Sequence, residues 1–216
     1  MFKSIRQQLK TTPAKLVAVS KTKPAWAILE LYNKGQRAFG ENKVQEMVAK
    51  YEQLPKDIEW HFIGHLQTNK VKYIAPFVQC IHSVDSLKLL NEINKQAKKN
   101  DRFIDCLLQF HIAEEESKFG LDQSEAAEIL DTPELKELEN IRITGVMGMA
   151  TFTENMEQVR KEFKNLKSIF DHLKRAYFPD KEYFKEISMG MSGDYEIAVE
   201  EGSTMVRIGT LIFGIR

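Results

Sequence analysis

The stretch KLVAVSKTKP, residues 15–24, carries the pattern that decides the fold. It begins with an apolar run of strand length that ends at Ser20, and a short polar loop then leads to Pro24. Proline is favoured in the first turn of a helix, and the amphipathic residues 26–32 that follow it end just before Gly35. The stretch therefore predicts a β-strand followed by an α-helix.

The same unit recurs along the whole chain. Many of the strand-like runs are apolar throughout, which is typical of strands that are covered on both faces. The longest helical segment, residues 155–178, places its apolar residues at steps of three and four, so that they form one stripe facing the sheet. The eight expected strands are residues 15–20, 37–40, 59–64, 79–84, 103–110, 141–150, 183–189 and 204–208.

Eight strands that alternate with helices have one closed arrangement, the (β/α)₈ TIM barrel of the α/β class. Such a barrel needs roughly 200–250 residues, and the chain has 216. We therefore expect residues 1–216 to form a single barrel domain. An open doubly wound sheet is the alternative, because alternation alone does not show closure. No GxGxxG or GxxxxGK motif follows the first strand, which argues against a nucleotide-binding version of that sheet.

Composition excludes several classes of protein. Lys and Arg together number 31, as do Asp and Glu, so no net charge draws the chain to nucleic acid or an anionic membrane. No apolar run approaches the ~18 residues of a membrane-spanning helix, and the N-terminus has no apolar signal core. Cys80 and Cys106 lie in apolar runs without CxxC spacing, so we expect buried free thiols, no disulfide, no metal site and a cytoplasmic location.

Lys21 follows the first strand directly, at the end of the barrel where functional residues gather. Loss of water and the partial positive charge of a helix start favour the neutral amine, which is the form that condenses with an aldehyde. A solvated loop lysine is the alternative, and on position alone it is the commoner case.

The last two strands supply a complementary feature. The loop SMGMSGD, residues 188–194, leads into a short helix over 195–199, and the stretch RIGT, residues 207–210, ends the last strand. Backbone N–H groups at a helix start, hydroxyls and glycines together form a phosphate cradle, and barrels often place one after strands seven and eight. Turn-forming glycines without a ligand are the alternative, and we expect Asp194 to cap the short helix.

Other polar and sulfur-containing side chains receive structural roles. His61 and His65 lie four residues apart in a strand-to-loop segment, so they do not share a helical face, and we expect hydrogen-bonded structural histidines rather than zinc ligands. Met147, Met149, Met189 and Met191 are expected to fill the core.

Six ordered blocks of sequence are specific in combination. The blocks are VSKTKP at 19–24, FGEN at 39–42, WHFIGHLQ at 60–67, SKFG at 117–120, GMAT at 148–151 and the long stretch 188–214. Together they resemble the pyridoxal phosphate homeostasis protein family, and the resemblance runs from about Leu16 to the C-terminus.

The resemblance implies a barrel similar to the N-terminal domain of alanine racemase, with pyridoxal 5′-phosphate held as an imine on Lys21. Carried over by position, Arg207 would face the pyridine nitrogen, and Asn42 would lie beside the ring. The phosphate would be held by Ser192, Gly209 and Thr210. Lys118 matches a lysine that would accept the cofactor by transimination.

The resemblance also implies a monomeric carrier or reservoir for the cofactor, with no catalytic residue, that serves vitamin B6 and amino-acid pools and supplies enzymes that need the cofactor. Racemisation needs acid–base groups on both faces of the α-carbon. In the racemases a second domain supplies one of them, and we expect no such domain here. An arginine at the ring nitrogen also weakens the electron sink. A racemase or lyase of amino acids is the alternative.

Overall fold

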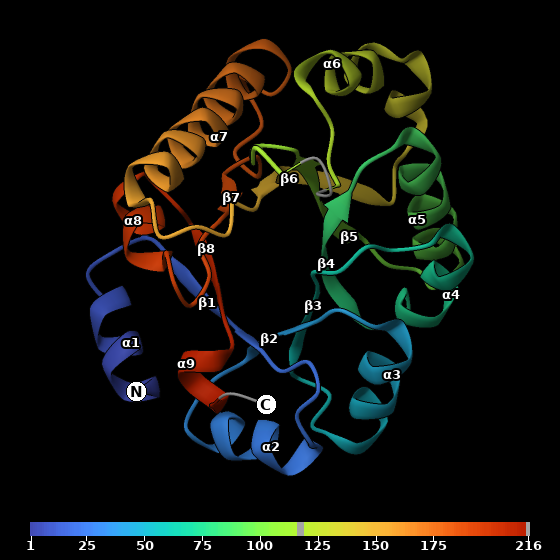
Figure 1. The fold of residues 1–216 in the computed structure, drawn as a ribbon. Coiled ribbons are helices and arrows are strands. Elements are labelled where there is room, and N and C mark those ends of the chain that lie inside the picture. The colour runs from blue at the N-terminus through green and yellow to red at the C-terminus, as the bar shows by residue number, and fades with distance from the viewer. Residues whose placement is uncertain (116–118, 215–216) are drawn as a thin grey trace.

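The computed structural model describes residues 1–115 and 119–214. In this part of the chain eight parallel strands pair in sequence order, and β8 pairs with β1, so the sheet closes into a barrel (Figure 1). This confirms the (β/α)₈ fold and excludes the open sheet. The strands are β1 (Lys15–Val19), β2 (Ala38–Glu41), β3 (Glu59–Phe62), β4 (Val78–Val84), β5 (Ile104–Phe110), β6 (Ile141–Gly148), β7 (Glu186–Ser188) and β8 (Met205–Ile208).

Helices surround the barrel and cover its outer face (Figure 1). Short 3₁₀ segments, η1 (Thr68–Lys70) and η2 (Pro133–Glu137), lie within the connections. The α-helices are α1 (Phe2–Leu9), α2 (Ala25–Asn33), α3 (Val44–Gln53), α4 (Val71–Ile74), α5 (Leu87–Lys99), α6 (Gln123–Asp131), α7 (Met156–Ala176), α8 (Tyr195–Glu200) and α9 (Thr210–Phe213).

The apolar stripe of α7 packs as its spacing predicts. Val159, Phe163, Leu166, Ile169 and Leu173 are all buried on one face of this helix. They join the main core, which lies between the strands and the surrounding helices. Within the described residues no helix is long and apolar enough to cross a membrane.

The interior of the barrel is more polar than this outer core. Side chains alternate along a strand, so Trp60 and Phe62 pack in the outer core while His61 points the other way. A separate apolar cluster of Cys80, Leu107 and Met147 also lies apart from the outer core. The barrel therefore encloses histidine and thiol groups beside a few apolar side chains.

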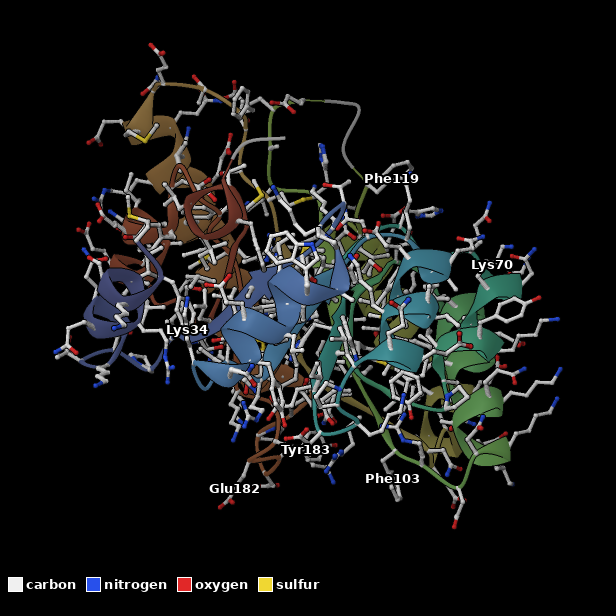
Figure 2. All side chains as sticks on the ribbon, turned by 90° about the horizontal axis from the view of Figure 1, so that it is seen from below. Lys34, Lys70, Phe103, Phe119, Glu182 and Tyr183 are labelled. Atoms are coloured by element: carbon white, nitrogen blue, oxygen red, sulfur yellow. The ribbon has the colours of Figure 1, made fainter. Side chains whose placement is uncertain are left out.

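The two ends of the barrel differ. A side view shows Phe103, Glu182 and Tyr183, which precede β5 and β7, at one end, and Phe119, which follows β5, at the other (Figure 2). The second end carries the loops that follow the strands. Both cysteines are buried and free, as expected.

Candidate functional site

A cavity of about 850 Å³ opens at the carboxyl ends of the strands. It is bounded by the ends of β1, β2, β6, β7 and β8, and the segment 149–156 between β6 and α7 forms one wall. All six side chains or glycines expected from the sequence to hold a cofactor line it, namely Lys21, Asn42, Ser192, Arg207, Gly209 and Thr210. The fold thus brings together residues that are up to 189 positions apart in the chain.

Lys21 is held by the backbone on either side of it. Ser20 is fully buried, and its N–H donates to the carbonyl of Gly40 on β2. Thr22 adopts φ +64°, a left-handed conformation that is uncommon for a residue other than glycine. Among residues 1–115 and 119–214 the Lys21 ammonium has no hydrogen-bond or ion-pair partner. The turn therefore presents an uncommitted amine to the cavity.

A buried ion pair stabilises the turn that contains Lys21. Lys50 donates to Oε1 of Glu41 and to the carbonyl of Ser20, both at 2.7 Å, and the Ser20 hydroxyl donates to the same Oε1 at 2.6 Å. Burial raises the pKa of Glu41, and the hydrogen bonds from Lys50 and Ser20 oppose that shift. Lys50 thus links the residue before Lys21 to β2 and α3.

Asn42 has an unused polar atom. Its Oδ1 is buried and has no hydrogen-bond partner among the described residues, although the residue lines the cavity. Gly64 lets its backbone approach that of Asn42 closely, since a Cβ at position 64 would lie 2.4 Å from the carbonyl oxygen of Asn42. A buried acceptor without a partner is costly, so this position suits a bound polar ligand.

The loops after β7 and β8 offer several free N–H groups. The N–H groups of Ser192, Gly193 and Thr210 have no partner in the described part of the chain, while that of Gly209 donates to Ser192 Oγ at 3.4 Å. Converging N–H groups and hydroxyls make an anion site.

Asp194 differs from its expected role. It is the first residue before α8, but its carboxylate does not bond to a helix N–H. It accepts from the N–H of Met191 instead and so closes the loop that precedes the helix. The expectation of a helix cap was wrong, because the carboxylate accepts from the Met191 N–H of the preceding loop and makes no capping bond to α8.

One of the four methionines differs from its expected role. Met147 and Met189 are buried in the core, and Met149 packs against the inner apolar cluster while it also lines the cavity. Met191 lines the cavity. Met149 and Met191 both lie just after a strand ends, where side chains turn toward the mouth of the barrel.

Arg207 is the buried cation of the site. Only 4% of it is exposed, and it donates from Nη1 to Ser188 Oγ at 2.6 Å and from Nη2 to the carbonyl of Gly148 at 3.0 Å. Burial lowers its pKa to about 10, and Asp194 acts in the opposite direction. Arg207 therefore remains charged near neutral pH, and it can only donate hydrogen bonds.

The hydrogen-bond chain continues from Ser188 through the barrel. Ser188 Oγ lies 2.9 Å from His82 Nδ1, and His82 Nε2 lies 2.8 Å from His61 Nδ1. The Ser188 hydroxyl has no other acceptor among the described residues, so it donates to His82 Nδ1, and His82 in turn donates from Nε2 to His61 Nδ1. Burial lowers the pKa of His61 to about 3 and that of His82 well below its ordinary value, so both rings are neutral.

The remaining sequence expectations fall elsewhere. His61 is a hydrogen-bonded buried histidine, as expected, whereas His65 lies on the surface, stacked on Phe119, with Nδ1 3.6 Å from Asp85. His82 and Ser188 were not expected to matter. The one available signal was that each lies in a buried strand of the barrel. Lys118 lies outside the described residues.

The closed parallel sheet, with Lys21 and unpaired N–H groups around one cavity at its carboxyl end, makes this protein a (β/α)₈ barrel with a candidate binding site. The family described as alanine racemase, N-terminal domain, matches residues 2–216 of the chain. Pyridoxal phosphate homeostasis protein of Aquifex aeolicus is 46% identical over 204 residues, which span 94% of this chain and 87% of that protein. Its human namesake is 40% identical over 213 residues, spanning 94% and 76%. The chain therefore belongs to the pyridoxal phosphate homeostasis protein family, within the alanine racemase N-terminal domain group.

Solved structures agree with this assignment. PipY of Synechococcus elongatus, described with PLP bound, is 36% identical to this chain, with a TM-score of 0.88 over 99% of this chain and 98% of that one. Alanine racemase of Bartonella henselae shares the fold at 17% identity, with a TM-score of 0.71 over 99% of this chain and 57% of that one.

Proposed function

We propose that this chain binds pyridoxal 5′-phosphate in the 850 Å³ cavity and holds it for other proteins, without turning over a substrate of its own. In this proposal the Lys21 amine condenses with the aldehyde, so that one carbon–nitrogen double bond forms and one water leaves. Residues 1–216 act as one binding unit. The observation that carries the proposal is the uncommitted amine of Lys21 facing a group of unpaired N–H donors across one cavity.

Each part of the cofactor has a matching group in the cavity. The phosphate meets the N–H groups of Ser192, Gly193 and Thr210 and the hydroxyls of Ser192 and Thr210. Arg207 faces the pyridine nitrogen, and the unpaired Asn42 Oδ1 lies beside the ring. PipY, which has the same fold, is described with PLP bound.

The nature of Arg207 supports storage over catalysis. A guanidinium that is already charged can only donate to the pyridine nitrogen, so that nitrogen stays unprotonated and the ring withdraws electrons weakly. Among the described residues the titratable side chains that line the cavity are Lys21, Glu154, Asp194 and Arg207. Glu154 is exposed and Asp194 is engaged with Met191, so neither is placed as a second acid–base group. The relatives are also named for homeostasis.

The proposed setting is the cytoplasm, with the chain acting as a monomer that passes the cofactor to enzymes lacking it. The name of the relatives, pyridoxal phosphate homeostasis protein, supports the passing of the cofactor to other proteins.

Borohydride reduction followed by peptide mass mapping tests the proposal. The purified chain mixed with pyridoxal phosphate is expected to absorb in the visible and, after reduction, to carry the pyridoxyl mass on Lys21. Lys21→Ala is expected to lose both signals and to remain folded, because the amine supports no core contact. Attachment to Lys118 or to surface lysines alone would contradict the proposal.

Lys23→Ala is the matched control. Lys23 is two residues away, but its Nζ donates to the carbonyls of Phe213 and Gly214 and does not line the cavity. This variant is expected to keep the adduct on Lys21. Incubation with L-alanine in deuterated water tests the racemase alternative, since α-proton exchange at enzyme-like rates would defeat the storage role.

A further inference from the structure

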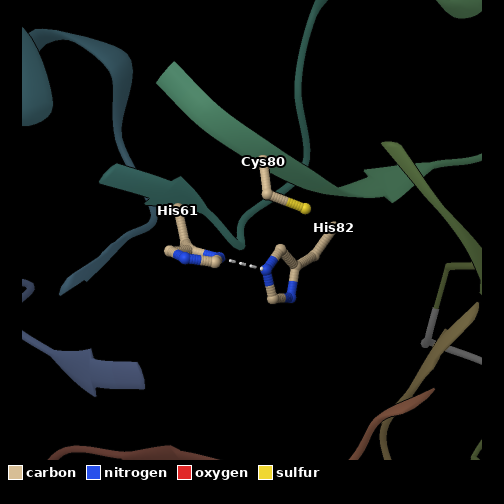
Figure 3. A group of neighbouring side chains, drawn as sticks. All are labelled: His61, Cys80 and His82. Atoms are coloured by element: carbon tan, nitrogen blue, oxygen red, sulfur yellow. Dashed lines mark hydrogen bonds between the residues drawn. The ribbon is translucent and has the colours of Figure 1, made fainter. Parts of the chain in front are cut away.

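The hydrogen-bond chain that begins at Arg207 ends inside the barrel, where several atoms that could bind a metal ion lie close together. His61, Cys80 and His82 are all buried, and one donor atom from each lies within 4.8 Å of the others (Figure 3). His61 and His82 are joined by one hydrogen bond, and the Cys80 sulfur lies beside them. These residues form no part of the cavity that faces Lys21.

His61 also has an unused nitrogen. Its Nε2 is buried and has no hydrogen-bond partner in the described part of the chain. Because His61 Nδ1 accepts from His82, Nε2 carries the ring's one proton and is an unpaired donor, which a water satisfies and a metal ion does not. The nitrogen that His61 turns toward His82 is therefore Nδ1.

A second cavity, of about 360 Å³, gives access to this cluster from the amino end of the barrel. Its lining includes His61 and Cys80 together with two oppositely charged pairs, Lys15 with Glu59 and Arg142 with Asp105. Lys15 and Glu59 are 46% and 40% exposed, so the cavity reaches solvent. Because the charges balance pairwise, a cation can approach His61 without crossing a one-sided field.

We propose that His61, Cys80 and His82 bind one Zn²⁺, with a water from the amino-end cavity as fourth ligand. Two imidazoles and one thiolate form a donor set that zinc favours. Tetrahedral zinc with bonds of ~2.0–2.3 Å places its ligand atoms ~3.3–3.8 Å apart. The ligand atoms lie within 4.8 Å of one another, so the widest pair must close by about an ångström, while the 2.8 Å hydrogen bond between His61 and His82 must open to admit the metal.

The protons balance in a simple way. The Cys80 thiol, whose pKa burial raises, gives up its proton to solvent through the cavity as the sulfur–zinc bond forms. Each imidazole stays neutral and keeps its one proton on the nitrogen that faces away from the metal. His82 then donates from Nδ1 to Ser188 Oγ, which reverses that contact and leaves the Ser188 proton without its acceptor, at the cost of one hydrogen bond.

Zinc binding by the full chain, stripped of metal and free of pyridoxal phosphate, tests the site. In competition with a chromophoric chelator, one equivalent of Zn²⁺ is expected to bind per chain. Cys80→Ser is expected to weaken this binding by about 100-fold or more. Co²⁺ in place of Zn²⁺ is expected to show a thiolate-to-metal absorption band in the unaltered chain and not in Cys80→Ser.

Cys106→Ser is the matched control, because Cys106 is equally buried but packs in the outer core. It is expected to keep both the affinity and the cobalt band. The proposed zinc site would be overturned if the unaltered chain showed no cobalt band. It would also be overturned if Cys80→Ser and Cys106→Ser lost zinc affinity and the cobalt band to the same extent. The cobalt spectrum needs no variant, so a misfolded Cys80→Ser leaves the test intact. If the chain bound zinc but not pyridoxal phosphate, the proposed function would be contradicted and the zinc site would stand.

Discussion

Arg207 and Ser188 lie on neighbouring strands, with Nη1 2.6 Å from Oγ, and this contact joins the cofactor cavity to the histidine pair inside the barrel. In the described part of the chain the Arg207 guanidinium donates to one other acceptor, the carbonyl of Gly148. The position of the guanidinium therefore depends on a serine hydroxyl that itself never reaches the cavity.

Ser188→Ala is expected to loosen cofactor retention. The change removes an acceptor from a buried charged group and a donor from His82, at a cost of ~1–3 kcal/mol in unfolding free energy. Urea denaturation and equilibrium dialysis with pyridoxal phosphate measure the two effects. Ser203→Ala is the control, because this fully buried serine donates to the carbonyl of Met189 and touches no site residue. It is expected to lower stability similarly while retention stays unchanged.

Lys50→Met is expected to destabilise the fold strongly. Glu41 is fully buried, so removing its cation leaves a buried charge that only the Ser20 hydroxyl still contacts, which costs ~3–5 kcal/mol. Adding Glu41→Gln to this variant is expected to recover part of the loss, because the unpaired charge disappears. Thermal and urea unfolding compare the two variants. If Lys50→Met alone were as stable as the unaltered chain, the ion pair would contribute nothing to the stability of the fold.

Gly190→Ala and Gly193→Ala are expected to behave differently. Gly190 has φ +96°, and a Cβ there would lie 2.5 Å from the Cβ of Ala198, so alanine is expected to cost ~1–3 kcal/mol and to displace the loop before α8. A Cβ on Gly193 meets nothing within 4 Å, so its alanine variant is expected to stay within ~0.5 kcal/mol. Calorimetry distinguishes them, and equal melting temperatures would contradict the expected crowding.

Thr210→Val is expected to weaken binding of pyridoxal phosphate about tenfold, the equivalent of one lost hydrogen bond to a charged group. The adduct on Lys21 is expected to survive, because Lys21 lies on a different strand end. Pyridoxal, which lacks the phosphate, supplies the control, and its affinity is expected to be the same for both chains. A uniform loss for both ligands would place Thr210 outside the anion site.

Acid is expected to weaken the zinc-free chain through His61. Its pKa is about 3 in the folded chain and 6.5 ordinarily, so between these values the unfolded chain binds a proton that the folded chain does not. The stabilising contribution is therefore complete above pH 6.5 and is lost as the pH falls toward 3, by at most ~1.4 kcal/mol per pH unit.

Urea denaturation with a chelator present, between about pH 7 and pH 4, measures this slope. His61→Gln is expected to show a shallower slope. His172→Gln, at an exposed position on α7, is expected to keep it. Equal slopes in all three chains would show that His61 does not resist protonation.

The barrel was predictable because each strand can be recognised from its own short apolar run. The expected run 59–64 became β3 (Glu59–Phe62), and the expected run 141–150 became β6 (Ile141–Gly148). Strand ends were the least certain because a loop that continues the direction of a strand has the same composition. The position of Lys21 at a strand mouth followed from the same pattern.

The histidine pair was not predictable, for a physical reason. In the run QCIHSV, residues 79–84, both faces of the strand are buried, so periodicity does not separate inward from outward side chains. The pairing of β4 with β5 also shifts register between Ile81 and Val84, which no sequence pattern signals. The contact of His82 with Ser188 joins residues 106 positions apart, and only the closed barrel brings them together.

Pairing of β1 with β8 has a consequence for biosynthesis. Lys21 follows the first strand to leave the ribosome, whereas Thr210 follows the last, so the nascent polypeptide carries the reactive amine long before its anion-binding counterpart exists. Under the proposed function, capture of the vitamin-derived molecule is therefore expected to follow translation of the last strand, and proteolytic fragments that lack this strand are expected to bind it more weakly.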